Sequence, residues 1–282
     1  MIYKNLGADH QLPAIGLGTW EMGGREAPEV SQNHLYIDSI QFALSKGLTH
    51  IDTAAYYGNG QSEIIVGQAI QAFNRPNVFI TTKVWHTQLR KNELLASAYK
   101  SIERLKTNYI DLLLIHFPNP DVPHAESMEA LNLLVEQKLV KHIGVSNYSV
   151  TQLQDAMRYS STPIEANQIE YSLNARNAGL YTQNMESEII PFCLQNNILV
   201  IAWRPLGKGK LLQIKPTDLL GKLALKYAKT PAQIALNWVA SKPGVITIPK
   251  ATSQMHIIEN AQAVDWSLSA QDILALELEY TS

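Results

Sequence analysis

This chain of 282 residues has a single cysteine, almost no net charge and no long apolar run. Its only cysteine, Cys193, cannot form an internal disulfide, and its apolar helical surroundings predict a buried structural thiol more than a reactive nucleophile. The 23 basic and 25 acidic residues leave a formal charge of -2, which gives no general attraction to nucleic acid or to an anionic membrane. Any anion that the protein binds must therefore be held by a local site.

Signals for secretion, membrane insertion and domain division are missing as well. The segment from Met1 to Asn5 lacks the charged-then-apolar order of a signal peptide, and no apolar run reaches the length of about 20 residues that crosses a bilayer. We therefore expect a cytoplasmic protein. We also expect a monomer or a weak oligomer. No Gly/Ser-rich or Pro-rich linker separates two halves, and single α/β barrels commonly occupy roughly 250 residues, so we expect residues 1–282 to form one domain.

What the chain does contain is a regular alternation of short, β-rich apolar runs and amphipathic segments. With 46% hydrophobic and 17% charged residues, the composition suits a globular protein with a substantial core. The alternation predicts parallel strands joined by crossover helices, and so an α/β fold, after an opening β-hairpin over residues 5–13. The expected strands are Ile15–Gly18, Thr49–Asp52, Val78–Thr82, Ile110–Ile115, His142–Val145, Ile164–Gln168, Leu199–Ala202 and Val245–Ile248.

The amphipathic segments predict helices that cover these eight strands. Clear examples are residues 91–105, 126–136, 231–240 and 253–261. In the third of these, Thr230 suits a helix cap and Pro231 a first helical turn. The pattern favours a (β/α)₈ barrel, the TIM-barrel architecture. An open doubly wound sheet is the alternative, but its fingerprint G-x-G-x-x-G is absent because Gly16–Trp20 lacks the third glycine.

Polar side chains follow three consecutive predicted strands. Asp52 and Tyr57 come after the second strand, while Lys83 ends the third and His116 ends the fourth. Working residues of an α/β barrel lie at the carboxyl ends of its strands, so these four side chains would face the same mouth. For any one of them a turn cap, a solvated rim charge or simple packing is a sufficient explanation. Together they make coincidence a poor explanation, above all because His116 ends an apolar strand, where an unpaired polar group is costly.

From Gly16 to Asn260 the sequence resembles the aldo-keto reductase family. The motifs that carry the resemblance are Gly16–Trp20, Gly144–Asn147, Asn167–Tyr171 and Ile248–Lys250, together with the four strand-end residues. The resemblance implies an oxidoreductase that reduces aldehydes or ketones to alcohols with NAD(P)H. It makes Asp52, Tyr57, Lys83 and His116 the catalytic tetrad. A glutamate in place of His116 would suit double-bond reduction within the family, so the histidine favours carbonyl chemistry.

Carbonyl reduction gives each of the four side chains a task. Hydride transfer to a carbonyl leaves an alkoxide, so an acid must lie within hydrogen-bond reach of the oxygen. For Tyr57 to donate and reclaim this proton, its pKa has to fall from about 10. A charged Lys83 beside it would favour the phenolate, and Asp52 would hold the ammonium in place. A neutral His116 would donate to the carbonyl oxygen and orient it.

The resemblance also implies a nicotinamide cofactor. Ser146, Asn147 and Gln168 would bind its carboxamide, since amide side chains each offer a donor and an acceptor. Ordinary strand-end capping is the alternative for Ser146 and Asn147. Trp203 stands where many relatives have tyrosine, and its indole keeps a flat surface that can stack on the nicotinamide. Arg204 either faces the pyrophosphate or is a solvated rim charge. The residues assigned to the cofactor are Gly18, Thr19, Trp20, Asp52, Ser146, Asn147, Gln168, Trp203, Arg204, Leu206, Lys250, Ala251, Thr252, His256, Glu259 and Asn260.

The segment after the last strand is expected to hold the adenosine end of the cofactor. Barrels often bind phosphate with the loops after strands seven and eight and a helix N-terminus. The resemblance pairs Lys250 with the 2′-phosphate of NADPH, adds a contact from Thr252, and places Glu259 and Asn260 at the adenine. His256 stands where NADPH-binding relatives usually have arginine, and histidine is largely neutral above its usual pKa of about 6.5. NADPH is therefore the expected cofactor, with a weakened preference that leaves NADH possible.

Four aromatic residues, Trp20, Tyr56, Trp85 and Phe117, are expected to form an apolar substrate wall, with core packing as the alternative for Trp85. No residue is assigned to a metal. Two other classes of protein remain open. A cofactor-binding regulatory or redox-sensing subunit would show little turnover with a generic aldehyde. A phosphate-ester isomerase or an aldolase would use Lys83 as a base or a Schiff-base amine, which borohydride trapping detects. The physiological substrate and the direction of flux stay open.

Overall fold

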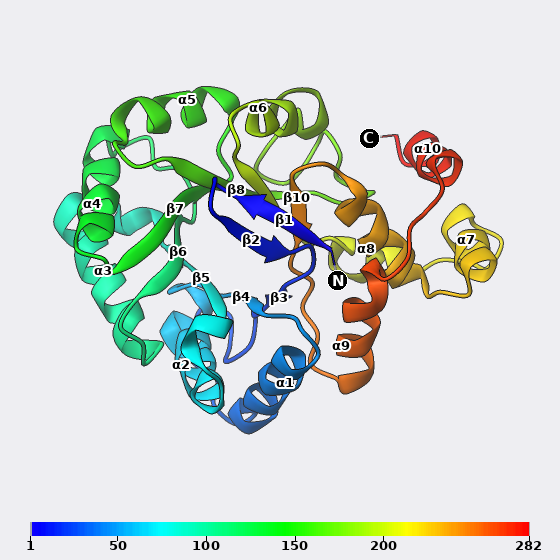
Figure 1. Ribbon diagram of the computed structural model, residues 1–282, viewed down its shortest axis with the longest axis horizontal. Coiled ribbons are helices and arrows are strands. Elements are labelled where there is room, and N and C mark those ends of the chain that lie inside the picture. The colour runs from blue at the N-terminus through cyan, green and yellow to red at the C-terminus, as the bar shows by residue number, and fades with distance from the viewer. Residues whose placement is uncertain (1, 282) are drawn as a thin grey trace.

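The centre of the molecule is a sheet of eight parallel strands, each paired with its neighbour in sequence (Figure 1). The computed structural model describes residues 2–281. The strands are β3 (Leu17–Gly18), β4 (His50–Asp52), β5 (Phe79–Val84), β6 (Ile110–Ile115), β7 (Val140–Ser146), β8 (Ile164–Glu170), β9 (Leu199–Trp203) and β10 (Val245–Thr247). All eight expected strands are present, with bounds that differ from the expected ones by up to two residues.

The sheet closes on itself where its first and last strands meet. Ile15, just before β3, forms a parallel bridge with Thr247 at the end of β10. The amide of Gly16 donates to the carbonyl of Thr247 at 2.8 Å. At Gly18 a β-carbon would come within 2.6 Å of the Ile248 carbonyl oxygen, so only glycine fits this close approach. The predicted (β/α)₈ barrel is confirmed.

Helices lie around the outside of the barrel (Figure 1). They are α1 (Asn33–Ser45), α2 (Gln61–Ala69), α3 (Lys91–Arg104), α4 (His124–Glu136), α5 (Val150–Tyr159), α6 (Ile190–Gln195), α7 (Leu219–Tyr227), α8 (Pro231–Ser241), α9 (Gln254–Ala261) and α10 (Ala270–Glu279). As expected, Thr230 caps α8 and Pro231 begins it. Cys193 is buried in α6, and burial raises the pKa of its thiol to about 12, which confirms the structural thiol. Within residues 2–281, none of the helices has the length and apolarity needed to cross a membrane.

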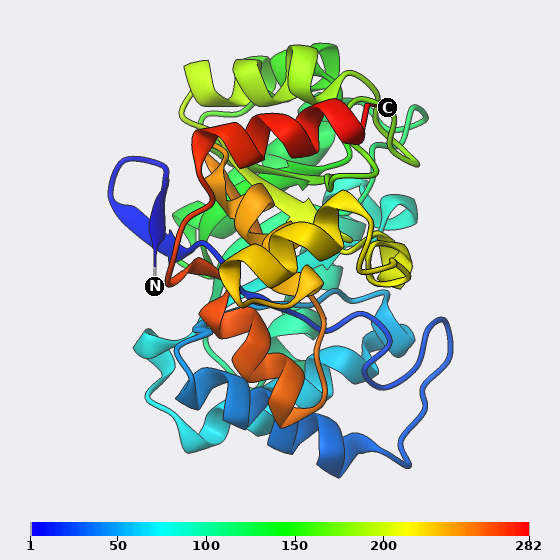
Figure 2. The same cartoon turned by 90° about the vertical axis from the view of Figure 1, so that its right-hand side faces the viewer.

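The predicted N-terminal hairpin covers one end of the barrel. Its strands β1 (Tyr3–Leu6) and β2 (His10–Pro13) pair in an antiparallel register. The side chains of Leu6 and Leu12 pack into the same apolar cluster as Leu112 and Ile246 of the barrel strands. Figure 2 shows the hairpin at one end and the long segment between β3 and α1 projecting at the opposite end. The hairpin therefore leaves only the carboxyl-end mouth open for chemistry.

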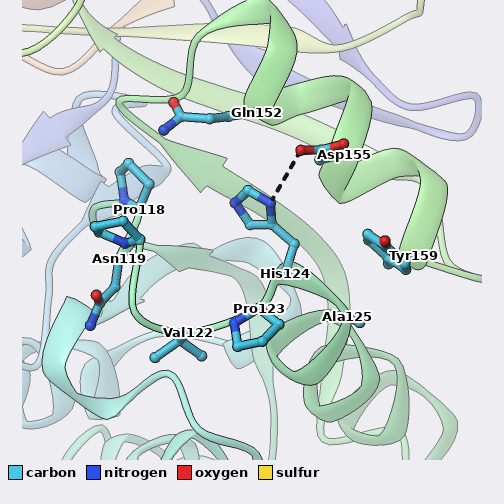
Figure 3. Close-up of a pocket in the computed structure, with 10 residues that line it drawn as sticks. Pro118, Asn119, Val122, Pro123, His124, Ala125, Gln152, Asp155 and Tyr159 are labelled. Carbon is cyan, nitrogen blue, oxygen red and sulfur yellow. Dashed lines mark ion pairs between the residues drawn. The ribbon is translucent and has the colours of Figure 1, made fainter.

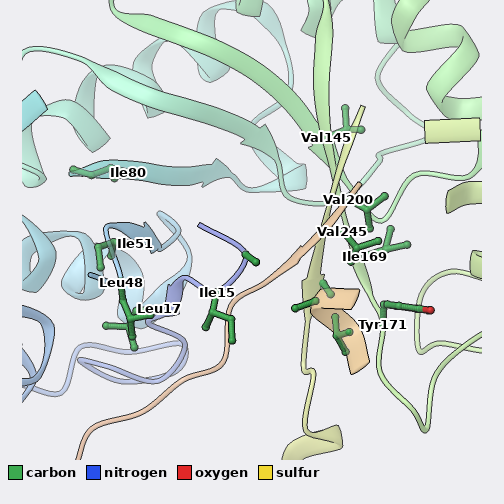
Figure 4. Packing of buried hydrophobic residues seen from close by; sticks show 14 of the residues in the cluster. Ile15, Leu17, Leu48, Ile51, Ile80, Val145, Ile169, Tyr171, Val200 and Val245 are labelled. Atoms are coloured by element: carbon green, nitrogen blue, oxygen red, sulfur yellow. The ribbon is translucent and has the colours of Figure 1, made fainter. Parts of the chain in front are cut away.

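Alternation along the strands decides which side chains enter the barrel. In β6, Leu113 and Ile115 belong to the outer core beneath the helices, whereas Leu112 and Leu114 belong to the inner cluster. Figure 4 shows part of the outer core, with Ile51, Ile80 and Val145 among its members. The next inward position after Leu114 is His116. The two-residue period of the strands therefore turns this imidazole toward the mouth.

Candidate active site

Lys83 is the centre of the polar cluster at the mouth. It lies near the end of β5, and its side chain is fully buried. Its ammonium Nζ donates to Asp52 Oδ1 at 2.5 Å, to the Thr53 carbonyl at 2.8 Å and to the Tyr57 hydroxyl at 3.2 Å. An ammonium has three donors, so all of them are in use. Burial lowers the pKa of Lys83, but the Asp52 carboxylate and the hydrogen bonds to Asp52 and Tyr57 outweigh it, and the pKa lies above its usual value.

This state of Lys83 argues against the aldolase and isomerase alternatives. A Schiff base or a general base needs a free amine with an accessible lone pair. Here the raised pKa keeps the nitrogen protonated, and three fixed acceptors surround it. Lys83 is therefore a buried cation that holds Asp52 and the Tyr57 hydroxyl by hydrogen bonds.

Asp52 links opposite sides of the barrel. It ends β4, and its second oxygen Oδ2 accepts a hydrogen bond of 2.7 Å from Nε2 of Gln168 on β8. Four steps in the strand order separate β4 from β8, so this bond spans the ring of eight strands. Burial raises the pKa of the Asp52 carboxyl, and Lys83 and Gln168 oppose that rise. With both oxygens accepting hydrogen bonds, the carboxylate holds the Lys83 ammonium in place.

Tyr57, and not the adjacent Tyr56, supplies the phenol of this cluster. The chain turns sharply after Tyr57 because Gly58 has a φ of +56°, and a β-carbon there would meet the Gly23 carbonyl oxygen at 2.2 Å. Tyr57 is buried, with its ring edge-on to Trp20 at a centroid distance of 4.8 Å. Tyr56 instead stacks flat on Trp85 at 3.8 Å. Two neighbouring tyrosines thus have different partners and different surroundings.

The expected lowering of the Tyr57 pKa is wrong. Burial raises the pKa of the Tyr57 phenol, and the Lys83 ammonium at 3.2 Å opposes the rise without overcoming it. The physical reason is that a buried phenolate loses its hydration, a cost that the sequence does not reveal. Tyr57 is therefore held in its protonated, proton-donating form.

His116 lies beside Tyr57, with ring centroids 5.6 Å apart. Burial first, and the nearby Lys83 ammonium second, hold the pKa of its imidazole well below the usual value. Its Nδ1 is buried without a hydrogen-bond partner among the described residues. The ring also stacks on Phe117 at a centroid distance of 5.2 Å. This environment favours the neutral imidazole that the sequence predicted.

The predicted carboxamide-binding residues form one connected group. The Ser146 hydroxyl donates to the Gln168 carbonyl at 2.8 Å, and Asn147 Nδ2 donates to Ser146 Oγ at 3.0 Å. Asn147 has a φ of +62°, which turns its amide toward the mouth side, where Oδ1 accepts from the Trp203 indole nitrogen at 3.2 Å. A hydroxyl, two amides and a flat indole therefore meet at the ends of three adjacent strands.

Lys250 and the predicted phosphate region lie at the end of β10 and the start of α9. Lys250 Nζ is 3.8 Å from Glu21 Oε2, and Glu21 Oε1 in turn pairs with Arg25 Nε at 2.6 Å. Burial lowers the pKa of Lys250, and Glu21 opposes that shift. His256 is exposed in the first turn of α9, where its amide bonds to Ser253. The sequence interpretation missed Glu21, whose only signal was its place directly after Gly18-Thr19-Trp20.

Several other predicted cofactor residues contact neighbouring residues of the protein. The hydroxyl of Thr19 is buried and donates to the Asp52 carbonyl at 3.0 Å. Arg204 lies over the Trp203 ring and 3.6 Å from Glu170 Oε1. Buried members of the set are Gly18, Ala251 and Asn260; Leu206 and Glu259 are half-buried, and Thr252 is exposed.

The predicted aromatic wall is brought together at the mouth, and it is larger than expected. Trp85 lies 5.6 Å from Phe117, edge to face, and Trp20 is parallel to Tyr56 at 6.4 Å. Tyr181 extends the wall, 4.7 Å from Phe117 and 6.0 Å from Trp203. It lies in a segment without helical or strand periodicity, so no sequence pattern indicated its position.

A separate cavity of about 310 Å³ lies outside the barrel mouth (Figure 3). It is lined by residues from the loop after β6, α4 and α5, and Figure 3 marks the 4.0 Å approach of His124 Nδ1 to Asp155 Oδ2. None of the tetrad residues lines it. The chemistry-bearing cluster is therefore at the carboxyl ends of the strands, and this cavity is not part of it.

Comparisons with known proteins agree with this architecture. The family model described as "Aldo/keto reductase family" matches residues 14–278. A 9,11-endoperoxide prostaglandin H2 reductase of Trypanosoma cruzi is 32% identical over 95% of this chain and 87% of that protein. A methylglyoxal reductase of Yersinia pestis is 35% identical over 93% of this chain and 91% of that protein.

Solved structures give the same answer. A thermostable aldo-keto reductase crystallised with the inhibitor epalrestat superposes with a TM-score of 0.93 at 38% identity, covering 99% of both chains. An aldo/keto reductase of Klebsiella pneumoniae in complex with NADP and acetate has a TM-score of 0.88 at 33% identity, covering 99% of this chain and 95% of that one. These proteins are described as reductases, so the comparisons do not support the regulatory-subunit alternative. With a family match along most of its length and relatives above 30% identity, the chain belongs to the aldo/keto reductase family.

Proposed function

We propose that this protein reduces aldehydes and ketones to alcohols with NADPH, as a single barrel domain in which Tyr57 donates the proton. The observation that carries the proposal is the Lys83 ammonium, which joins buried Asp52 to the Tyr57 hydroxyl beside a neutral His116. The glyoxal and methylglyoxal reductases among its relatives, and the NADP complex of a similar structure, support the reaction class and the cofactor.

The four side chains divide the work of proton transfer. A carbonyl oxygen between Tyr57 and His116 would accept hydrogen bonds from both, which polarises the carbonyl and fixes its orientation. As negative charge develops on the oxygen, the Tyr57 hydroxyl gives up its proton to it. Lys83, 3.2 Å away, stabilises the phenolate that this leaves, and Asp52 keeps the ammonium in position. The imidazole of His116 stays neutral throughout.

The residues at the mouth fit a nicotinamide group. The donor set of Ser146, Asn147 and Gln168 offers both donors and acceptors to a carboxamide, and the Trp203 indole offers a flat surface beside them. Bound NADPH supplies the hydride for the carbonyl carbon. In the present arrangement Asn147 Oδ1 bonds to Trp203 and Gln168 Nε2 bonds to Asp52. These two amides would exchange part of this bonding for a carboxamide.

The pKa values of Tyr57 and His116 predict a wide pH plateau for reduction. Because burial raises the pKa of Tyr57, its hydroxyl stays protonated above neutral pH. Because the pKa of His116 is depressed, its imidazole stays neutral below neutral pH. At saturating NADPH, kcat/KM for an aldehyde should change less than about threefold between about pH 6 and about pH 9. A stopped-flow or steady-state pH profile checks this. A fall in reduction with a midpoint below about pH 8 would contradict the raised Tyr57 pKa.

Cofactor preference should depend on Lys250. A charge-assisted hydrogen bond to the 2′-phosphate is worth about 1.5–3 kcal/mol. Glu21 already pairs with Lys250, so the lower end of this range applies. Lys250→Ala should therefore weaken NADPH binding roughly tenfold and leave NADH binding nearly unchanged, because NADH has no phosphate at that position. Fluorescence titration of both cofactors measures the effect, and His256→Arg should act in the opposite direction. Equal losses for the two cofactors would show that Lys250 supports the loop instead.

The direct test of the proposed function is a purified-protein assay that follows loss of NADPH and NADH absorbance with a panel of aldehydes, ketones and keto esters. We expect turnover with at least the reactive dicarbonyls, and faster turnover with NADPH than with NADH. Binding of NADPH without turnover of any carbonyl compound would overturn the proposal and favour a regulatory role.

A further inference from the structure

An aromatic residue sits at the tip of a small hairpin over the barrel mouth. Between β8 and α6 the chain forms an antiparallel bridge from Ala178 to Gln183, and the Gly179 amide donates to the Thr182 carbonyl at 2.9 Å. Tyr181 lies at the tip of this turn and is 54% exposed. A large ring held outward on a turn is solvated in the free protein, so a ligand could still cover it.

The base of this hairpin is anchored firmly. The Arg176 guanidinium bonds to both carboxylate oxygens of Glu186, with a shortest distance of 2.6 Å, and the Tyr171 hydroxyl also donates to Glu186 at 2.6 Å. At the tip, the Leu180 amide donates to Glu170 Oε2 at 2.6 Å, and Glu170 is the last residue of β8. Because the barrel wall itself holds the tip, Tyr181 is placed before any ligand arrives, which lowers the ordering cost of binding.

The Tyr181 ring lies one layer beyond the reacting centre. Phe117 stacks on His116 at 5.2 Å, and Tyr181 meets Phe117 edge to face at 4.7 Å. On its other side Tyr181 is 6.0 Å from Trp203. A carbonyl oxygen held between Tyr57 and His116 would thus leave Tyr181 out of reach of a methyl substituent. A flat ring on the carbonyl carbon or on the carbon next to it would extend past Phe117 to the exposed part of Tyr181.

We propose that Tyr181 is a specificity-determining residue that favours carbonyl compounds bearing an aryl group over small aliphatic ones. Aromatic pairs gain from edge-to-face or offset contacts at centroid distances of about 4.5–7 Å. Phe117, Tyr181 and Trp203 already contact one another at 4.7 and 6.0 Å, so their outer faces form one aromatic surface on which a substrate ring could lie. This inference rests on the proposed reductase function, and it adds the substrate class to it.

Phenylglyoxal and methylglyoxal provide a matched test, because they are the same dicarbonyl with a phenyl group exchanged for a methyl group. In wild-type protein with saturating NADPH, kcat/KM should be higher for phenylglyoxal. Tyr181→Ala should lower kcat/KM for phenylglyoxal by roughly five- to thirtyfold, mainly through KM, and change the value for methylglyoxal by less than about twofold. Tyr181→Phe should keep the preference, since it keeps the ring. Leu180→Ala, which removes the neighbouring exposed side chain of the same tip, should keep it too.

The outcomes separate this inference from the proposed function. If wild-type protein binds NADPH but reduces neither dicarbonyl, the proposed function fails. If it reduces both and Tyr181→Ala leaves their kcat/KM ratio unchanged, or lowers both values equally, the reductase stands and Tyr181 does not read the substrate. An equal phenyl-specific loss in Leu180→Ala would also overturn the inference, because the effect would then belong to the shape of the hairpin and not to the ring.

Discussion

Replacement of Tyr57 with phenylalanine should lower kcat by roughly 10²- to 10⁴-fold, while NADPH affinity stays nearly unchanged. The ring would keep its edge-to-face contact with Trp20 at 4.8 Å and its place beside His116, so the fold should tolerate the change. What is lost is the hydroxyl that Lys83 contacts at 3.2 Å and that gives its proton to the developing alkoxide. Steady-state kinetics with one aldehyde, together with fluorescence titration of NADPH, measure the two quantities separately.

The neighbouring tyrosine provides a matched control. Tyr56→Phe removes an equivalent hydroxyl one residue away, but that ring stacks on Trp85 and has no contact with Lys83 in the described structure. Its effect on kcat should be no more than about threefold. Near-normal turnover in Tyr57→Phe would remove Tyr57 from the mechanism, and an equal loss in both variants would point to damage of the aromatic wall.

Much of this site is readable from the sequence because parallel strands place their ends together. The apolar run of β6 and the polar His116 after it mark a strand end without any knowledge of the fold. Asp52 is the last residue of β4, and Lys83 is the last but one of β5. The strand bounds shifted by no more than two residues. The alternation of inward and outward positions then determines which side chains point toward the mouth. Local pattern is sufficient where the chemistry lies on regular elements.

Contacts across the barrel and in its loops were beyond the reach of local pattern. The bond between Asp52 and Gln168 joins residues 116 positions apart in sequence. Glu21, paired with Lys250, lies in a segment without periodicity, as does Tyr181. Their partners depend on how the loops fold over the mouth, and a single sequence has no period that encodes this.

The direction of the Tyr57 pKa is a different kind of failure. Sequence reasoning placed the cation next to the phenol correctly, and on that basis expected the pKa to fall. Burial is a property of the finished fold, and here desolvation of the phenolate outweighs the attraction of Lys83. The size of two opposing effects, and not the identity of the residues, decided the outcome.

Because Lys83 is the group that opposes this rise, Lys83→Met should impair both directions of the reaction. Without the ammonium the Tyr57 pKa climbs further, so the phenolate that alcohol oxidation needs becomes scarcer at neutral pH. We expect losses of roughly 10²- to 10³-fold, with oxidation affected at least as strongly as reduction. The alkaline rise of alcohol oxidation should also move to higher pH by at least about one unit, a shift that a purely structural role of Lys83 would not produce.

A second variant separates loss of catalysis from loss of stability in Lys83→Met. Lys83→Met leaves Asp52 buried with Gln168 as its remaining side-chain donor, and an uncompensated buried charge can cost about 3–5 kcal/mol of stability. In the double variant Asp52→Asn/Lys83→Met the unpaired charge is gone, so the free energy of unfolding should recover while activity stays low. Urea unfolding and the two pH profiles then distinguish the causes. If the double variant is stable and oxidises alcohols at the wild-type rate and pH, the pairing of Lys83 with Tyr57 has no catalytic meaning, and the ammonium serves only to neutralise a buried carboxylate.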